Sequence, residues 1–215
     1  MKSFVVFGLG RFGSTVATKL SELHYDVLAV DNNYERVQSV ADQVTTALQV
    51  DMMDENAINA LGLSNFDGAV IAIGENFEAA VMSTIVAKEA GIPLIIGKAK
   101  TLRQGSILKR LGLDEVVYPE RDMGLRVAYN LTSNNLLDYI QISQEISIAE
   151  IKVLPQWENQ TIEFLELRKK FQVNILAIER DGDVEVNPRP DRILEADDVL
   201  IIVGKDKDVK SIEEV

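Results

Sequence analysis

Apolar and amphipathic segments alternate along the first half of the chain, and this alternation predicts strands and helices in turn. Val27–Val30 and Ala69–Ile73 are continuously apolar, as in strands buried on both faces. The expected strands are Phe4–Phe7, Val27–Val30, Thr46–Val50, Ala69–Ile73, Leu94–Ile96 and Glu115–Val117. The expected helices are Phe12–Leu23, Glu35–Asp42, Glu55–Leu61, Ala79–Ala90 and Leu102–Leu111. This order predicts parallel βαβ units and an α/β fold with a doubly wound, Rossmann-like sheet.

The pattern changes near residue 120. The stretch "ERDMGLRVAYNLTSNNLLDYI" reads as a long helix with a polar interruption at Thr132–Asn135. After it we expect a half-buried strand in "ISIAEIKVL", a helix at Ile162–Lys170 and a strand at Ile175–Ile178. A turn in "RDGD" should lead into another strand, and a strand at Val199–Val203 and an acidic tail helix should follow. The sequence therefore predicts a second, smaller α+β domain, with the boundary near Ser133–Asn135 and domains of residues 1–134 and 135–215.

Composition narrows the class of protein. Of the 215 residues, 47% are hydrophobic and 26% are charged, which suits one large or two small globular domains. The net charge of −12 argues against binding to nucleic acid or anionic lipid, because both need a basic face. With no cysteine, the chain has no disulfide and no thiolate nucleophile or metal ligand. We see no signal peptide and no run near the ~20 apolar residues of a membrane span, so we expect a cytoplasmic protein, free to dock on a membrane protein.

A glycine-rich turn carries the clearest chemistry. Gly8, Gly10 and Gly13 follow the first strand in G-x-G-x-x-G spacing and open the first helix. Gly8 permits a tight turn, Gly10 lets a phosphate approach the backbone, and Gly13 allows close packing of helix on strand. The helix N-terminus itself favours an anion. We therefore expect a nucleotide site here, the alternative being a glycine turn that binds nothing.

Other candidate residues follow the strands at their carboxyl ends. Asp31 ends the second strand, 18 residues after Gly13, where a carboxylate accepts hydrogen bonds from ribose and disfavours the 2′-phosphate of NADP. A helix cap is the alternative role. Asp51 ends the third strand, where it would meet an adenine amino group or cap a helix. Gly74 and Glu75 should line the same crevice.

Arg11 lies inside the glycine loop. A guanidinium beside the phosphates suggests an extra charge to neutralise, such as the terminal phosphate of ADP or ATP. A solvated surface arginine is the alternative.

Catalytic groups are hard to find. Hydride transfer needs a proton acceptor near the substrate, and the chain's one histidine, His24, lies at the end of the first helix. The second domain has no nucleophile or carboxylate pair with recognisable spacing. We therefore expect a nucleotide sensor and not an enzyme. The alternative is a small NAD-dependent oxidoreductase or an NAD(H) redox sensor, and a DNA-binding regulator is disfavoured because no basic reading element is present.

Several motifs together resemble a known family. They are "GLGRFG", "AVD", "IAIGEN", "LKRLGLDEVVYPERDMG" and "NNLLDYI", and they resemble the regulator-of-potassium-conductance (RCK) or TrkA family, in particular its KtrA/KtrC type. The resemblance covers nearly the whole chain, including a C-terminal TrkA-C domain. It implies a regulatory subunit of a bacterial potassium-uptake system, which forms dimers and then an eight-subunit ring on the cytoplasmic face of a separate potassium-translocating membrane subunit. ATP and ADP would hold the ring in different shapes.

The resemblance also implies roles for single residues. Arg11 matches an arginine that touches the terminal phosphates, Asp31 the ribose-binding acid, and Lys98 a lysine that lines the site. Glu120 matches a glutamate that reaches the partner subunit's nucleotide and helps to hold a divalent or monovalent cation beside the γ-phosphate; a helix-start acid is the alternative. With the strand-end residues above, the expected site comprises Gly8, Gly10, Arg11, Phe12, Gly13, Asp31, Asn32, Asp51, Met52, Gly74, Glu75, Lys98 and Glu120. The family's usual sequence after the third strand is replaced here by "VDMMDEN", where Met52 and Met53 are available to pack on adenine.

A second ligand is implied for the smaller domain. The stretch "TIEFLELRKKFQVNILAI" resembles one that binds cyclic di-AMP in some family members. Arg168 would meet a phosphate and Asn174 an adenine edge, while the bases would pack on Ile162, Leu167, Ile175 and Pro188 at a two-fold interface. Phe171 and Gln172 depart from the family pattern, and an ordinary dimer core is the alternative.

Overall fold

A computed structural model describes residues 2–132, 136–143 and 145–212 of the chain. The chain divides into two compact units, the first ending at Arg121 and the second beginning at Asp122. The predicted boundary at residues 133–135 lies outside the described residues, so the division into 1–134 and 135–215 stays a prediction. No described helix is long and apolar enough to cross a membrane.

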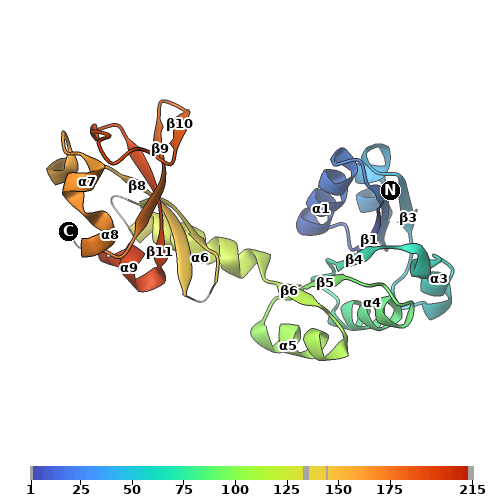
Figure 1. Ribbon diagram of the computed structural model, residues 1–215. Helices are drawn as coiled ribbons and strands as arrows, with labels where there is room; N and C mark the ends of the chain where they lie inside the picture. The colour runs from blue at the N-terminus through green and yellow to red at the C-terminus, as the bar shows by residue number, and fades with distance from the viewer. Residues whose placement is uncertain (1, 133–135, 144, 213–215) are drawn as a thin grey trace. The chain divides into compact units, whose positions relative to one another are not determined.

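The first unit is built on a six-stranded parallel sheet in the order β3-β2-β1-β4-β5-β6 (Figure 1), which confirms the predicted Rossmann-like fold. Its strands are β1 (Ser3–Phe7), β2 (Asp26–Asp31), β3 (Thr46–Gln49), β4 (Gly68–Ile71), β5 (Ile95–Lys98) and β6 (Glu115–Val117). Its helices are α1 (Arg11–Glu22), α2 (Tyr34–Val40), α3 (Glu55–Asn59), α4 (Phe77–Glu89) and α5 (Leu102–Leu111), with 3-10 turns η1 (Ala41–Gln43) and η2 (Leu63–Asn65).

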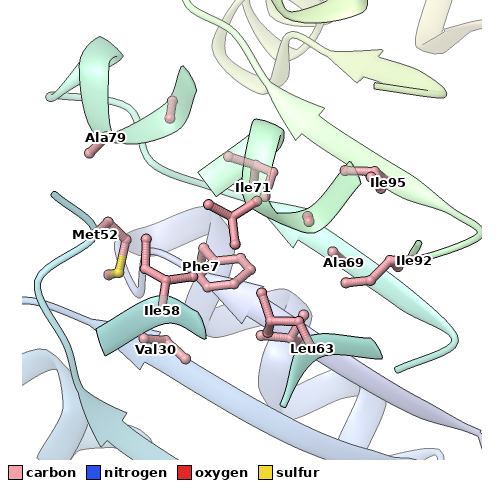
Figure 2. Close-up of a cluster of buried hydrophobic side chains, with 14 of the residues drawn as sticks. Phe7, Val30, Met52, Ile58, Leu63, Ala69, Ile71, Ala79, Ile92 and Ile95 are labelled. Atoms are coloured by element: carbon pink, nitrogen blue, oxygen red, sulfur yellow. The ribbon is translucent and has the colours of Figure 1, made fainter. Parts of the chain in front are cut away.

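Two cores sandwich this sheet. On one face Phe7 and Ile71, both fully buried, pack with Ile58 of α3 and with α4 and α5 (Figure 2). On the other face Val6 and Ala29 pack with residues of α1 and α2. Because successive side chains of a strand point to opposite faces, both sets of positions must be apolar, which explains the continuous apolar runs in the sequence.

The order of the strands positions the candidate site. From β1 the chain proceeds outward to β2 and β3 on one side, and then returns to β4, β5 and β6 on the other. The turns that leave β1 and β4 therefore diverge at the carboxyl edge of the sheet. In doubly wound folds, ligands bind in the crevice that this divergence opens.

The second unit contains a five-stranded antiparallel sheet in the order β10-β9-β11-β8-β7. Its strands are β7 (Leu136–Gln141), β8 (Ile146–Lys152), β9 (Asn174–Arg180), β10 (Asp183–Val186) and β11 (Val199–Lys205). Its helices are α7 (Ile162–Leu165), α8 (Leu167–Lys170) and α9 (Asp206–Ser211), with the 3-10 turn η3 (Pro155–Trp157). Leu200, Ile202 and Ile151 form the buried face of the sheet, against which Trp157 and Val209 pack.

Helix α6 (Pro119–Thr132) begins in the first unit and continues into the second, where side chains fasten it to the sheet. Arg126 forms an ion pair with Asp138 of β7. The Lys210 ammonium of α9 donates to the Tyr129 hydroxyl at 3.0 Å and lies 4.4 Å from the centre of that ring. These contacts fix the part of α6 that follows the division between the units.

The prediction of helix across residues 136–140 is wrong, because these residues form strand β7. The spacing of Leu136, Tyr139 and Ile140 is compatible with a helix. It also suits a strand with a bulge, and the register between β7 and β8 shifts between Leu136 and Asp138. Hydrogen bonding to β8 decides between the two, and this partner is not visible in local periodicity.

Two smaller elements of the second unit lie close to their predictions. The helix predicted at Ile162–Lys170 is divided into α7 and α8 at Glu166, which adopts left-handed φ of 48°. The turn predicted in "RDGD" joins β9 to β10 as a hairpin, with positive φ at Asp181 and Gly182, as in the tight turns that match the twist of a hairpin.

Candidate nucleotide-binding site

A cleft of about 620 Å³ opens at the carboxyl edge of the parallel sheet, between the glycine turn and the ends of β2 to β5. The structure brings together there all the predicted nucleotide-site residues except Gly13. Those in the wall are Gly8, Gly10, Arg11, Phe12, Asp31, Asn32, Asp51, Met52, Gly74, Glu75, Lys98 and Glu120.

The three glycines differ in why the chain needs them. Gly8 has φ of +93°, a conformation that other residues rarely adopt, and its N–H donates to the Val30 carbonyl at 2.7 Å. A Cβ on Gly13 would lie 1.8 Å from the Gly8 carbonyl oxygen, so Gly13 permits α1 to pack on the turn. A Cβ on Gly10 would meet no atom within 4 Å, and the backbone there is ordinary, with φ −67°. The fold does not require a glycine at position 10, whereas a ligand close to the backbone would.

Helix α1 presents its N-terminus to the cleft. Gly10 is the N-cap residue and so offers no side chain to the first N–H groups, and the first turn carries no acidic residue. These N–H groups and the helix dipole favour an anion. Arg11, the first residue of the helix, is exposed and lines the same cleft. The two features suit a phosphate chain.

Asp31 is 3% exposed and holds the glycine turn to the end of β2. Its carboxylate accepts from the Leu9 N–H at 2.6 Å and from the Asn33 N–H at 2.8 Å, and it lies 3.7 Å from an Arg36 guanidinium nitrogen. The cap of α2 is Asn33, whose side chain accepts from the Arg36 N–H, so capping is not the role of Asp31. A carboxylate has about four acceptor positions, which leaves capacity for a ribose hydroxyl.

Asp51 likewise does not cap a helix. Its carboxylate accepts from the Met53 N–H at 2.9 Å, and Asp54 is the N-cap of α3. The helix begins later than the strand-end position suggests because the residues after β3 turn first around Asp51. The exposed Asp51 lines the cleft, and Met52 beside it is 4% exposed and belongs to the core.

Lys98 and Glu120 form an ion pair in the cleft. The Lys98 ammonium donates to the Glu120 carboxylate at 2.5 Å, with the Lys98 side chain 11% exposed and that of Glu120 64% exposed. The hydrogen bond from Lys98, together with the charges of Lys98 and Arg11, lowers the pKa of Glu120 although burial opposes this. Glu120 is thus ionised and close to two cations of the cleft.

Sequence reasoning missed several residues of the wall, which are Leu9, Ser14, Arg36, Ala72, Ile73, Asn76, Ala79 and Lys100. Lys100 could have been predicted from the sequence. It lies two residues after Lys98 in "GKAK", and this spacing places both side chains on one side of an extended chain. A Cβ on Gly74 would lie 3.6 Å from the Lys100 side chain and 3.7 Å from the Lys98 ammonium. Arg36 lines the cleft from the first turn of α2, where a guanidinium nitrogen lies 3.7 Å from the Asp31 carboxylate.

The residues expected to bind cyclic di-AMP are differently placed in the second unit. Arg168 and Asn174 are exposed, whereas Ile162, Ile175 and Pro188 are half-buried. Leu167 is 4% exposed and packs in the core of the unit itself. Their part in ligand binding stays a prediction.

Metal-ligating side chains do not gather in the part of the chain that the structure describes, where no group of three or more histidines, aspartates or glutamates could hold an ion. Glu120 is instead engaged with Lys98. A cation held by Glu120 would need oxygens from elsewhere, and the phosphates of a nucleotide are oxygen ligands of the kind that Mg²⁺ prefers.

Comparison with known proteins identifies the family of this chain. Family models of the TrkA-N domain and the TrkA-C domain match residues 4–119 and 148–215. The chain is 38% identical over 212 residues to the Ktr system potassium uptake proteins C and A of Bacillus subtilis (strain 168), covering 99% of this chain and 96% of each relative. The RCK domain of GsuK has the same fold, with a TM-score of 0.70 at 19% identity over 99% of this chain and 47% of that one, so this chain spans about half of that protein. The chain therefore belongs to the RCK or TrkA family of potassium-transport regulators, in its KtrA/KtrC-type branch.

Proposed function

We propose that this chain is the nucleotide-gated regulatory subunit of a potassium-uptake system and that it controls ion flux through a separate potassium-translocating membrane subunit. ATP and ADP bind in the cleft of the first unit and favour different conformations. The subunit works on the cytoplasmic face of the membrane, as dimers assembled into an octameric ring, and is not an enzyme. The names of the two Bacillus relatives, which are potassium uptake proteins, support the potassium-uptake part of this proposal.

The observation that carries the choice of ligand is the set of basic side chains that line the cleft together with the N-terminus of a helix. Arg11, Lys98 and Lys100 line the wall with the N-terminus of α1. The pyrophosphate of a dinucleotide carries about two negative charges, whereas a terminal phosphate adds up to two more. Three cations and a helix N-terminus suit the more highly charged tail of ADP or ATP.

Gating then follows from differential affinity. A ligand shifts an equilibrium between two conformations only as far as it prefers one of them, and each tenfold preference is worth about 1.4 kcal/mol. ATP and ADP differ by one phosphate, so the groups that contact this phosphate carry the discrimination. Arg11 and a cation beside Glu120 are the proposed groups.

The first experiment measures nucleotide affinity by calorimetry for the wild type and Arg11→Ala. We expect ATP binding to weaken about tenfold or more, because a hydrogen-bonded charge pair contributes about 1.5–3 kcal/mol. ADP and NADH should weaken less. Arg103→Ala is the matched control, since Arg103 is exposed on α5 and lies outside the cleft wall. Equal loss for ATP and NADH would contradict the role of Arg11 at the terminal phosphate.

The second candidate is a small NAD-dependent oxidoreductase or an NAD(H) redox sensor. Asp31 favours it, because a carboxylate at this place suits the ribose of NAD as well as that of ATP. Solved structures of GsuK carry NAD and ADP. Binding of NADH alone, unaffected by Arg11→Ala, would favour this candidate, and turnover of NADH with a carbonyl substrate would make it an enzyme.

Cyclic di-AMP is the proposed second ligand, at a two-fold interface between second units. Arg168 contacts a phosphate in this arrangement, so Arg168→Ala is expected to weaken cyclic di-AMP about tenfold and to leave ATP affinity unchanged. Lys170→Ala controls for the loss of one exposed positive charge on the same helix. Calorimetry with both ligands checks this, and equal effects of the two variants would contradict it.

A further inference from the structure

We infer that Glu120 is an internal competitor for the nucleotide: in the empty cleft its carboxylate occupies Lys98, a phosphate-binding cation that the terminal phosphate of ATP must capture. This inference rests on the proposed function, because it concerns how the same site is regulated. In this arrangement Lys98 helps to discriminate between nucleotides. Glu120 has a state in which it is paired with Lys98, distinct from any state in which it contacts a metal ion.

The Lys98 ammonium lies where a phosphate in the cleft would bind it. The Lys98 ammonium lies next to Gly74, which follows β4, and it lines the same cleft as the glycine turn. Its side chain is largely buried, so its charge needs a partner. The Glu120 carboxylate provides that partner at 2.5 Å. An anion thus already occupies the cation that a phosphate in the cleft would use.

The neighbourhood of the carboxylate is the second argument. Glu120 is influenced by Arg11 as well as by Lys98, so its charge lies within reach of both cations proposed to read phosphate. With its side chain 64% exposed, Glu120 is also free to leave. An exposed partner of this kind is held weakly, and a phosphate with up to two charges can displace it.

Displacement of Glu120 affects helix α6, because Glu120 is part of that helix. Glu120 is in the first turn of α6, and the remainder of this helix is fastened to the second unit through Arg126 and Tyr129. While Glu120 holds Lys98, the first turn of α6 is tied to the cleft wall. Release by a terminal phosphate removes this tie and frees the carboxylate for another partner. ADP, with less charge at the far end, should release it less completely.

The test is affinity without divalent cations, since a cation would give Glu120 a second role. Glu120→Gln is expected to tighten ATP binding about two- to fivefold in EDTA, the range that an exposed ion pair supports. ADP binding should tighten less. Asp122→Asn removes a charge from an exposed residue of the same helix outside the cleft wall and should change neither affinity.

A double-mutant cycle identifies the partner. If Glu120 acts by occupying Lys98, the gain from Glu120→Gln disappears in a Lys98→Met background. A gain that persists there would overturn the assignment of Lys98. Unchanged or weaker ATP binding by Glu120→Gln in EDTA would overturn the inference as a whole. If the wild type binds no ATP at all, the proposed function fails first, so the two failures are distinguishable.

Discussion

Gly13→Ala is expected to destabilise the first unit by about 3 kcal/mol or more, the upper part of the range for overpacked sites. The new methyl group would lie 1.8 Å from the Gly8 carbonyl oxygen and 2.9 Å from the Ala72 Cβ. The carbonyl is backbone, and Gly8 itself is held by its bond to Val30, so neither neighbour can move aside cheaply. Hydrogen exchange at the amides of β1 and β2 measures the loss.

Gly10→Ala is the matched variant with the opposite expectation. Its methyl group meets nothing within 4 Å and its backbone conformation is open to alanine, so stability should stay within about 0.5 kcal/mol of the wild type. ATP affinity should nevertheless fall about tenfold, because the methyl group takes the space of a phosphate near the backbone. Wild-type affinity in Gly10→Ala would contradict placing the phosphates at this turn.

Asp198→Asn is expected to destabilise the second unit by about 1.5–3 kcal/mol, the range for losing a hydrogen bond to a charged group. Asp198 is fully buried directly before β11, where it accepts from Arg180 at 2.7 Å and from the Glu195 N–H at 2.8 Å. Arg192 lies 3.4 Å away. The amide fits the same space but leaves Arg180 and Arg192 with only the half-exposed carboxylates of Glu195 and Glu185 as counter-charges.

Urea unfolding followed by fluorescence measures this effect in one unit, because the chain's only tryptophan, Trp157, lies in the core of the second unit. Asp183→Asn, at an exposed position of β10, is the control and should change stability by less than about 0.5 kcal/mol. A similar small change in Asp198→Asn would show that Glu195 and Glu185 are sufficient counter-charges for the two arginines.

The same carboxylate predicts a dependence on pH. Burial raises the pKa of Asp198, but hydrogen bonds from Arg180 and the Glu195 N–H, together with the charge of Arg192, hold it below the ordinary value of 3.8. The contribution of Asp198 to the free energy of unfolding is therefore complete above the pKa of the unfolded state. It is lost as the pH falls through the lower pKa of the folded state. The unfolding midpoint of the second unit should decline below about pH 4, and less steeply in Asp198→Asn.

The parallel sheet could be predicted because its strands are marked locally. A strand buried on both faces has no polar position, and a helix that packs on it has a period near 3.6, so the two alternate visibly in the sequence. The strand at residues 136–141 has no such mark, since its edge position, bulge and pairing with β8 depend on residues further along the chain. Its prediction as helix was wrong for this reason.

The residues of the candidate site also divide into those that the local sequence predicts and those that it does not. Residues at or just beyond the end of a strand, such as Asp31 and Gly74, could be predicted because strand ends converge at one edge of a parallel sheet. Arg36 was missed, since it reaches the cleft from the first turn of a helix. The sequence allows Asp51 either to meet an adenine or to cap a helix, whereas the structure assigns the cap of α3 to Asp54, because the loop geometry decides where a helix begins.

By itself, the sequence determined the fold class, the glycine turn and the edge of the sheet where the cleft lies, because each depends on the order and spacing of residues along the chain. Only the tertiary structure decided which of three glycines the fold requires, since this depends on the atoms that a Cβ would meet. It also decided that Glu120 holds Lys98, residues 22 positions apart. Pairing between distant side chains depends on how the backbone between them folds, and no local pattern encodes it.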